Sequence, residues 1–270
     1  GPVGFAVGGE YRHESSHFSP DLFSRNGLRF DDASTRDPRN RSLDGSFDVV
    51  EAFGEVRVPL LQGKPLAEQV EASGAFRFAD YSTVGSTLSW QFNGTWMPVS
   101  DLALRVGYAR AIRAPNIRVL FLPGTAARFN VDDPCDPANL DEGPPVRRDN
   151  CLSQTRLGVP EGFVDQRAGI SIPGESAGNP NLTEEQAETF TLGAVITPRF
   201  VSGLSMTVDY WSIDLTDAIQ PLPAQQVVDR CFDSPVFPNT EACDSLVRAG
   251  DGTVLDVNFP NSFDFIRTQT

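Results

Sequence analysis

The chain has 270 residues, a net charge of −14 and 40% hydrophobic residues, which fits one or two globular domains. The negative charge argues against nucleic-acid binding, because phosphates are bound through Lys and Arg side chains. The sequence lacks a run of about 18 apolar residues and so excludes a protein that crosses a membrane through helices. Its 19 Phe, 23 Gly and 21 Pro favour strands and turns. We therefore expect an all-β fold.

The predicted strands share an alternation of apolar and polar residues, which places the two kinds of side chain on opposite faces. In the first strand, residues 5–12, Val7 and Tyr11 face one way and Glu10 and Arg12 face the other. The same alternation predicts strands at residues 70–78, 90–96, 102–109 and 204–210, and less regularly at 50–58 and 190–196.

The connections decide between a soluble sandwich, which hides its apolar face in a core, and a membrane barrel, which turns that face toward lipid. Short turns are predicted at residues 61–65, 82–85, 97–101 and 198–203, and long connections after Tyr11, Pro115 and Asp217. If the first strand runs outward, every long loop lies on the outer side, as in bacterial outer-membrane barrels. A connection of about 70 residues after Pro115 also counts against a compact soluble domain. We favour the barrel.

Aromatic residues near the ends of the predicted strands would suit the girdles at the two membrane interfaces. They are Trp90, Trp96, Tyr81, Tyr108, Tyr210 and Trp211. The alternative is that Trp and Tyr are simply frequent in strands.

The segment from His13 to His17, HESSH, matches the zinc-protease pattern H-E-x-x-H. That motif requires a helix, which brings its two histidines to one face, but the flanking residues here alternate with a strand period. In an extended chain the two histidines lie about 13 Å apart, too far to share one zinc ion. We expect a solvated transition from strand to loop and no metal site.

Four cysteines fall in two pairs, each inside one predicted outer loop: Cys135 with Cys151, and Cys231 with Cys243. Local disulfides suit an exported protein and would restrain loops that have little core of their own. A zinc site is the alternative, although C-x-x-C spacing is lacking and the histidines are distant in sequence.

Charged residues of the first long loop suggest two further sites. Its carboxylates could gather calcium, although their spacing fits a solvated acidic loop better. These are Asp132, Asp133, Asp136, Asp141 and Glu142. Arg147 and Arg148, with Phe129 in the same loop, are candidates to bind an anionic ligand, because guanidinium groups pair well with carboxylates. Motifs for an enzyme or a bound cofactor are lacking, so we expect neither catalysis nor a cofactor.

Three segments resemble the TonB-dependent outer-membrane receptors. They are ARAIRAPNIRVLF at residues 109–121, GNPNLTEEQAE at 178–188 and VDYWSID at 208–214. In the family the first ends a strand and begins a long outer loop, and the second leads into the next strand. Val119 departs from the pattern, since many members have an acidic residue there.

The resemblance implies that residues 1–270 are part of a barrel of about 22 strands, of which roughly eight are present. The family's plug domain, its energy-coupling box and the last barrel strands are missing from this sequence. The resemblance further implies active uptake of a ferric siderophore, haem, cobalamin or saccharide across the outer membrane of a Gram-negative bacterium. The implied partners are membrane lipid, a small nutrient ligand and a TonB-type protein that pulls on the plug. A passive porin and a soluble secreted binding domain are the alternatives.

Overall fold

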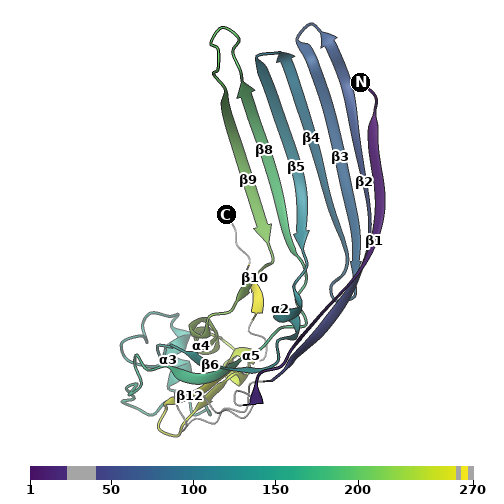
Figure 1. Ribbon diagram of the computed structural model, residues 1–270. Helices are drawn as coiled ribbons and strands as arrows, with labels where there is room; N and C mark the ends of the chain where they lie inside the picture. The colour runs from purple at the N-terminus through teal and green to yellow at the C-terminus, as the bar shows by residue number, and fades with distance from the viewer. Residues whose placement is uncertain (23–40, 260–262, 267–270) are drawn as a thin grey trace.

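The computed structural model describes residues 1–22, 41–259 and 263–266. Seven antiparallel strands form one curved sheet, which we call the wall (Figure 1). Its strands, in order across the sheet, are β1 (Gly4–Phe18), β2 (Leu43–Lys64), β3 (Ala67–Tyr81), β4 (Gly85–Val99), β5 (Leu102–Arg113), β8 (Glu185–Ile196) and β9 (Met206–Thr216). The wall confirms the predicted all-β fold and the weaker strand predictions at residues 50–58 and 190–196.

The connections are sorted between the two ends of the wall, as predicted. Short turns join β2 to β3, β4 to β5 and β8 to β9 at one end, whereas the long connections leave from the other (Figure 1). We call the second end the outer end. The short turn between β3 and β4 lies at the outer end as well. β1 and β2 project beyond this turn, since they remain paired as far as Phe18 and Leu43, while β3 ends opposite Val49.

The register of the wall places the apolar side chains on one face. Phe92 of β4 lies opposite Gly74 of β3 and Tyr108 of β5, and residues paired in this way project to the same side. Phe92 is 62% exposed, because the described residues contain no second sheet that covers this face. The same face holds Phe5, Val7, Val56, Phe76, Phe78, Leu88, Val106, Leu192 and Val208. A sandwich is therefore excluded.

Four of the six aromatic residues proposed for the girdles lie on the face that a girdle requires. Trp90, Trp96, Tyr108 and Tyr210 lie on the apolar face. Trp96 donates to the carbonyl of Leu66 at the short-turn end (2.9 Å), and Tyr108 donates to Glu188 toward the outer end (2.7 Å). Placing Tyr81 and Trp211 in the girdles was wrong, because they lie on the opposite, polar face. Trp211 directly follows Tyr210, and neighbouring strand residues point to opposite sides.

The H-E-x-x-H segment lies inside a strand. β1 continues to Phe18, so the expected transition from strand to loop at His13 to His17 was wrong. His13 pairs with Asp48 (2.8 Å) and His17 with Asp44 (3.5 Å), both directly across the ladder on β2. Each histidine therefore has its own acidic neighbour on an exposed strand face.

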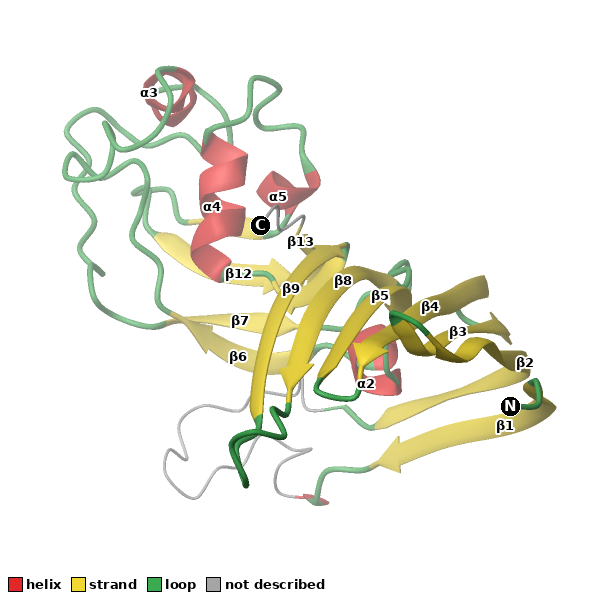
Figure 2. Cartoon of the chain, turned by 90° about the horizontal axis from the view of Figure 1, so that it is seen from above, coloured by secondary structure: helices red, strands yellow, loops and turns green. Residues whose placement is uncertain are grey.

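The long connections fold into a second unit, which we call the cap and define as residues 123–176 and 222–259. Its sheet has the order β11 (Leu246–Arg248), β12 (Val254–Phe259), β7 (Ile172–Ser176) and β6 (Thr125–Phe129). Its helices are α3 (Val146–Cys151), α4 (Ala224–Phe232) and α5 (Glu241–Asp244). Figure 2 shows β6, β7 and β12 side by side, with α4 next to them.

Three short elements connect the wall to the cap. Helix α2 (Ile117–Phe121) follows β5, while β10 (Ala218–Pro221) follows β9 and pairs with β13 (Phe263–Ile266). No helix in the described ranges is long and apolar enough to span a bilayer.

Candidate functional site

The polar face of the wall is lined with ion pairs between neighbouring strands. Arg57 of β2 donates to Glu71 of β3 at 2.7 Å. Arg77 of β3 contacts Glu51 of β2, whose side chain is only 1% exposed. Because each guanidinium is matched by a carboxylate, this part of the polar face carries little unbalanced charge.

One ion pair crosses an intervening strand. Arg105 of β5 donates through two nitrogens to Asp209 of β9, at 2.8 and 3.1 Å, although β8 lies between these strands. The pair passes over Gly193 of β8, where an added Cβ would collide with both side chains. Gly193 therefore provides the space that lets β5 and β9 be joined across the wall.

Between β1 and β5 the polar face forms an open hollow of about 450 Å³. Its lining combines small side chains, including Ala75, Ser89 and Ala109, with larger polar and charged ones. The latter are Glu10, Glu55, Arg77, Gln91 and Arg110. The charged and amide groups can hydrogen-bond to water. Such a surface suits a water-filled interior.

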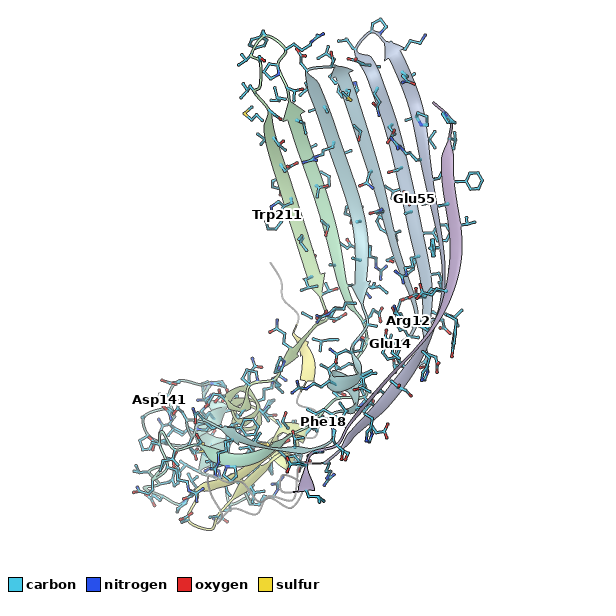
Figure 3. The ribbon with its side chains drawn as sticks, viewed as in Figure 1. Arg12, Glu14, Phe18, Glu55, Asp141 and Trp211 are labelled. Atoms are coloured by element: carbon cyan, nitrogen blue, oxygen red, sulfur yellow. A yellow bond between two sulfur atoms is a disulfide. The ribbon has the colours of Figure 1, made fainter. Side chains whose placement is uncertain are left out.

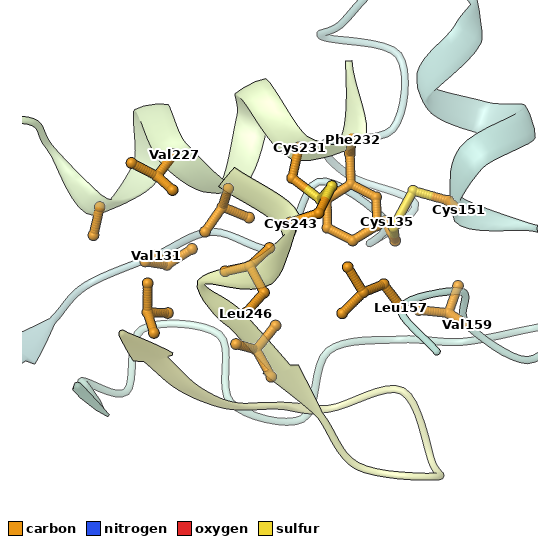
Figure 4. Close-up of a cluster of buried hydrophobic side chains, with 14 of the residues drawn as sticks. Val131, Cys135, Cys151, Leu157, Val159, Val227, Cys231, Phe232, Cys243 and Leu246 are labelled. Carbon is orange, nitrogen blue, oxygen red and sulfur yellow. A yellow bond between two sulfur atoms is a disulfide. The ribbon is translucent and has the colours of Figure 1, made fainter. Parts of the chain in front are cut away.

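The cap has a hydrophobic core of its own, shared by the two long connections. Phe232 and Val228 of the second connection are fully buried in one cluster with Leu157 and Ile172 of the first. Figure 4 shows Phe232 and Leu157 within this cluster. The cap sheet also spans both connections, since β7 pairs in parallel with β12. The expectation that these loops have little core was therefore wrong. The apolar residues of either connection are too few to form a core, but together they bury a continuous one.

Both cysteine pairs form disulfides in this core. Cys135 bonds to Cys151 and Cys231 bonds to Cys243, each within one connection. All four residues are at most 4% exposed. The contacts that join the two connections are consequently noncovalent.

Buried ion pairs add to those contacts. Arg248 of the second connection donates to both oxygens of Asp133 in the first, at 2.6 and 2.7 Å. Their side chains are 0% and 3% exposed, and the guanidinium also stacks over the ring of Phe232, 4.9 Å from its centre. In so dry a location either charge alone would be strongly unfavourable.

The three residues predicted to bind a ligand lie in the cap, and two of them have structural partners there. Arg147 is 6% exposed and bonds to Asp233 at 2.6 and 2.8 Å, and this hydrogen bonding raises its pKa. Arg148 is exposed and pairs with Asp141. Phe129 packs against the cap core. Arg147 therefore joins the two connections of the cap.

The loop carboxylates are dispersed rather than gathered around a common centre. Asp133 is taken by Arg248, and Asp136 accepts backbone hydrogen bonds from Ala138 and Asp165. Asp141 points outward from the cap (Figure 3). Among the described residues, no group of three His, Cys, Asp or Glu side chains is placed to hold a metal ion.

A second hollow, of about 500 Å³, lies where the projecting β1–β2 hairpin meets the cap, and we call it the junction pocket. Figure 3 shows Phe18, one of its lining residues, at this junction. The pocket is lined by Phe18, Pro20, Arg41, Leu43, Arg118, Leu122 and Thr125. It therefore combines apolar walls with two guanidinium groups. Neither arginine was predicted from the sequence to bind a ligand, although Arg118 is the only charged residue in the otherwise apolar helix α2.

Helix α2 is held in place beside this pocket. Asn116 caps it by accepting a hydrogen bond from the backbone N–H of Val119 (3.0 Å). Ile117 packs with the inner-face residues Phe47 and Val49 of β2. Two further hydrogen bonds tie α2 and Leu122 to residues 178–179, where the chain returns toward β8. The position of Arg118 is thus set by contacts on both sides of its helix.

The comparison with protein families decides what this architecture is. The model for TonB dependent receptor-like β-barrels matches residues 2–254. The chain belongs to this family. The wall is therefore a sector of an antiparallel transmembrane β-barrel, with its apolar face toward lipid and its polar face toward the lumen.

Solved structures of receptor barrels share the fold. A ferric enterobactin receptor mutant from Pseudomonas aeruginosa, solved with enterobactin, superposes with a TM-score of 0.56 at 17% identity. The siderophore receptors PirA from Pseudomonas aeruginosa and from Acinetobacter baumannii give TM-scores of 0.52 and 0.53, at 16% and 15% identity. Each comparison covers 98% of this chain but only 29%, 34% and 30% of the respective receptor. A sequence search among characterised proteins found no match.

Proposed function

We propose that this barrel sector belongs to a receptor that imports a ferric siderophore across the outer membrane of a Gram-negative bacterium. The observation that carries the proposal is the arrangement of the molecule: a lipid-facing wall with a polar lumen and a folded cap over its outer end. Solved receptors that share this fold are described as siderophore receptors. Transport is driven by a TonB-type protein acting on a plug domain supplied by the rest of the receptor.

Uptake by cells tests this function directly. The complete receptor gene is deleted, and accumulation of radioactive iron from ferric siderophores is measured with and without the gene restored on a plasmid. We expect restored cells to accumulate iron from at least one ferric siderophore, and to lose this ability when the TonB-type protein is also deleted. Uptake that persists without the TonB-type protein supports a passive porin instead.

Fractionation tests the membrane location separately. We expect the complete receptor in the outer-membrane fraction, as a band whose electrophoretic migration changes on heating. A protein recovered in the soluble fraction would contradict the proposed location and favour a secreted binding domain.

A further inference from the structure

The arginines of this chain divide into two groups. Most of those in the described ranges have a carboxylate partner. Those in ion pairs are Arg12, Arg57, Arg77, Arg105, Arg113, Arg147, Arg148, Arg156, Arg199 and Arg248. Arg110 and Arg167 bond to amide or carbonyl oxygens. Within the part of the chain that the structure describes, Arg41, Arg118 and Arg128 have no such partner.

Two of these three unpaired arginines line the same hollow. Arg41 and Arg118 come from segments 77 residues apart, yet both contribute to the junction pocket, whereas Arg128 does not. The pocket's other walls are largely apolar, with Phe18 and Leu43 forming the last rung of the β1–β2 ladder. The described lining of the pocket thus combines the guanidinium groups of Arg41 and Arg118 with an apolar surface.

Two arginines without a carboxylate partner are unusual in a protein as acidic as this one. The cap has 15 Asp and Glu residues against 7 Arg, and the whole chain carries a net charge of −14. In so acidic a protein, carboxylates are available to neutralise any exposed guanidinium. The field of distant carboxylates is screened within about 8 Å at physiological salt, and Arg41 and Arg118 are the charged residues among the described ones that line the pocket. A negatively charged ligand is favoured there even though the cap as a whole repels it.

Building on the proposed function, we propose that the junction pocket selects the class of ligand by binding its negative charge. The ligand is an anionic iron(III) chelate with apolar or aromatic arms. Arg41 and Arg118 bind its anionic oxygens, and Phe18, Leu43 and Leu122 contact its arms. Uncharged chelates and saccharides lack the charge that the two arginines require, and they bind more weakly.

Binding measurements on the complete receptor, purified in detergent, test this proposal. The variants are Arg41→Gln and Arg118→Gln, and the matched control is Arg128→Gln, which removes the third unpaired arginine outside the pocket. The probes are ferric enterobactin, a polyanionic iron(III) catecholate, and an uncharged iron(III) trihydroxamate. Heat-modifiable migration verifies that each variant is folded. Arg118→Lys, which retains the charge, serves as a second variant.

We expect each pocket variant to weaken ferric enterobactin binding by roughly 10-fold or more, as for loss of a charge-assisted hydrogen bond. Arg128→Gln should bind as the wild type does, and Arg118→Lys should lose less affinity than Arg118→Gln. Wild-type binding of the catecholate should also weaken as salt is raised.

Two outcomes overturn different statements. If the receptor binds ferric enterobactin and the pocket variants bind it equally well, the pocket proposal is wrong while siderophore uptake stands. The pocket proposal also fails if the uncharged trihydroxamate binds as tightly as the catecholate. If cells take up no ferric chelate through the wild-type receptor, the proposed function itself fails.

Discussion

The wall and the cap use the same kinds of apolar residue in opposite ways. In the wall, Phe76 and Phe92 are 54% and 62% exposed, on a face with no covering layer in the described chain. In the cap, Phe232 and Val228 are fully buried in a core. Apolar side chains turn away from water, so the wall is organised for lipid on its outside and the cap for water on its outside. The same chain therefore contains one unit whose surface suits lipid and one whose surface suits water.

The largest expected effect comes from removing a charge from the cap core. Arg248→Met leaves the buried carboxylate of Asp133 without its cationic partner, and we expect the cap to lose about 3–5 kcal/mol of stability. Hydrogen exchange of cap amides in the complete receptor measures the loss. Arg148→Met, which breaks an exposed pair, should cost less than about 1 kcal/mol. Equal losses in the two variants would show that the cap interior is not dry.

The wall can be tested with two adjacent residues. Phe92→Lys places a charge on the lipid face near the middle of β4, and we expect it to cost about 2–4 kcal/mol of folding stability in a bilayer. Asn93→Lys, one residue further on the lumen face, should be tolerated. Urea titrations of the receptor folded into vesicles compare the two. A reversal of their order would mean that the faces have been assigned the wrong way round.

The cap disulfides should matter to the cap alone. Replacing Cys231 and Cys243 by Ser removes a short cross-link, which we expect to cost about 2.5–3 kcal/mol. The cap should become sensitive to protease while the barrel still shows heat-modifiable migration. Loss of the barrel band in this variant would indicate that the wall depends on the cap for its stability.

The smallest expected effect concerns pH. Burial raises the pKa of Asp229, so its folded form holds a proton more tightly than its unfolded form. The cap therefore loses stability as pH rises through the raised pKa. Asp229→Asn removes this loss, and we expect the variant to match the wild type at about pH 2.5, below the unfolded-state pKa of about 3.9, and to exceed it at pH 7 by up to about 0.5 kcal/mol. Hydrogen exchange at the two pH values measures the difference.

The wall could be predicted from sequence because its physics is local. Alternation with a period of two and the lengths of the connections were enough to place the strands and to sort the loops. The strand ends were less predictable. β1 extends past His13 to Phe18 because its partner strand β2 continues beside it, and the residues in this stretch do not alternate by hydropathy.

The cap and the junction pocket could not be predicted, since both depend on contacts between distant segments. Arg147 looked like a ligand-binding residue in its own loop, but its partner Asp233 lies 86 residues later. Arg41 belongs to no motif, and the segment that contains Arg118 resembles the family where a strand ends and a loop begins, with no indication of a binding site. The two arginines line one pocket because the β1–β2 hairpin lies beside α2. The periodicity of a sequence describes one strand at a time, so it cannot predict a contact between distant segments.

The pairing of β7 with β12 has a consequence for the order of assembly. The cap sheet joins Gly174 to Val257, and the strands β8 and β9 lie between them in the chain. The first half of the cap therefore cannot complete its sheet or its core until the second half, which follows β8 and β9 in the chain, lies beside it. Until the two halves meet, apolar side chains of the first half such as Leu157 and Ile172 lack the cover that Phe232 and Val228 give them in the folded cap.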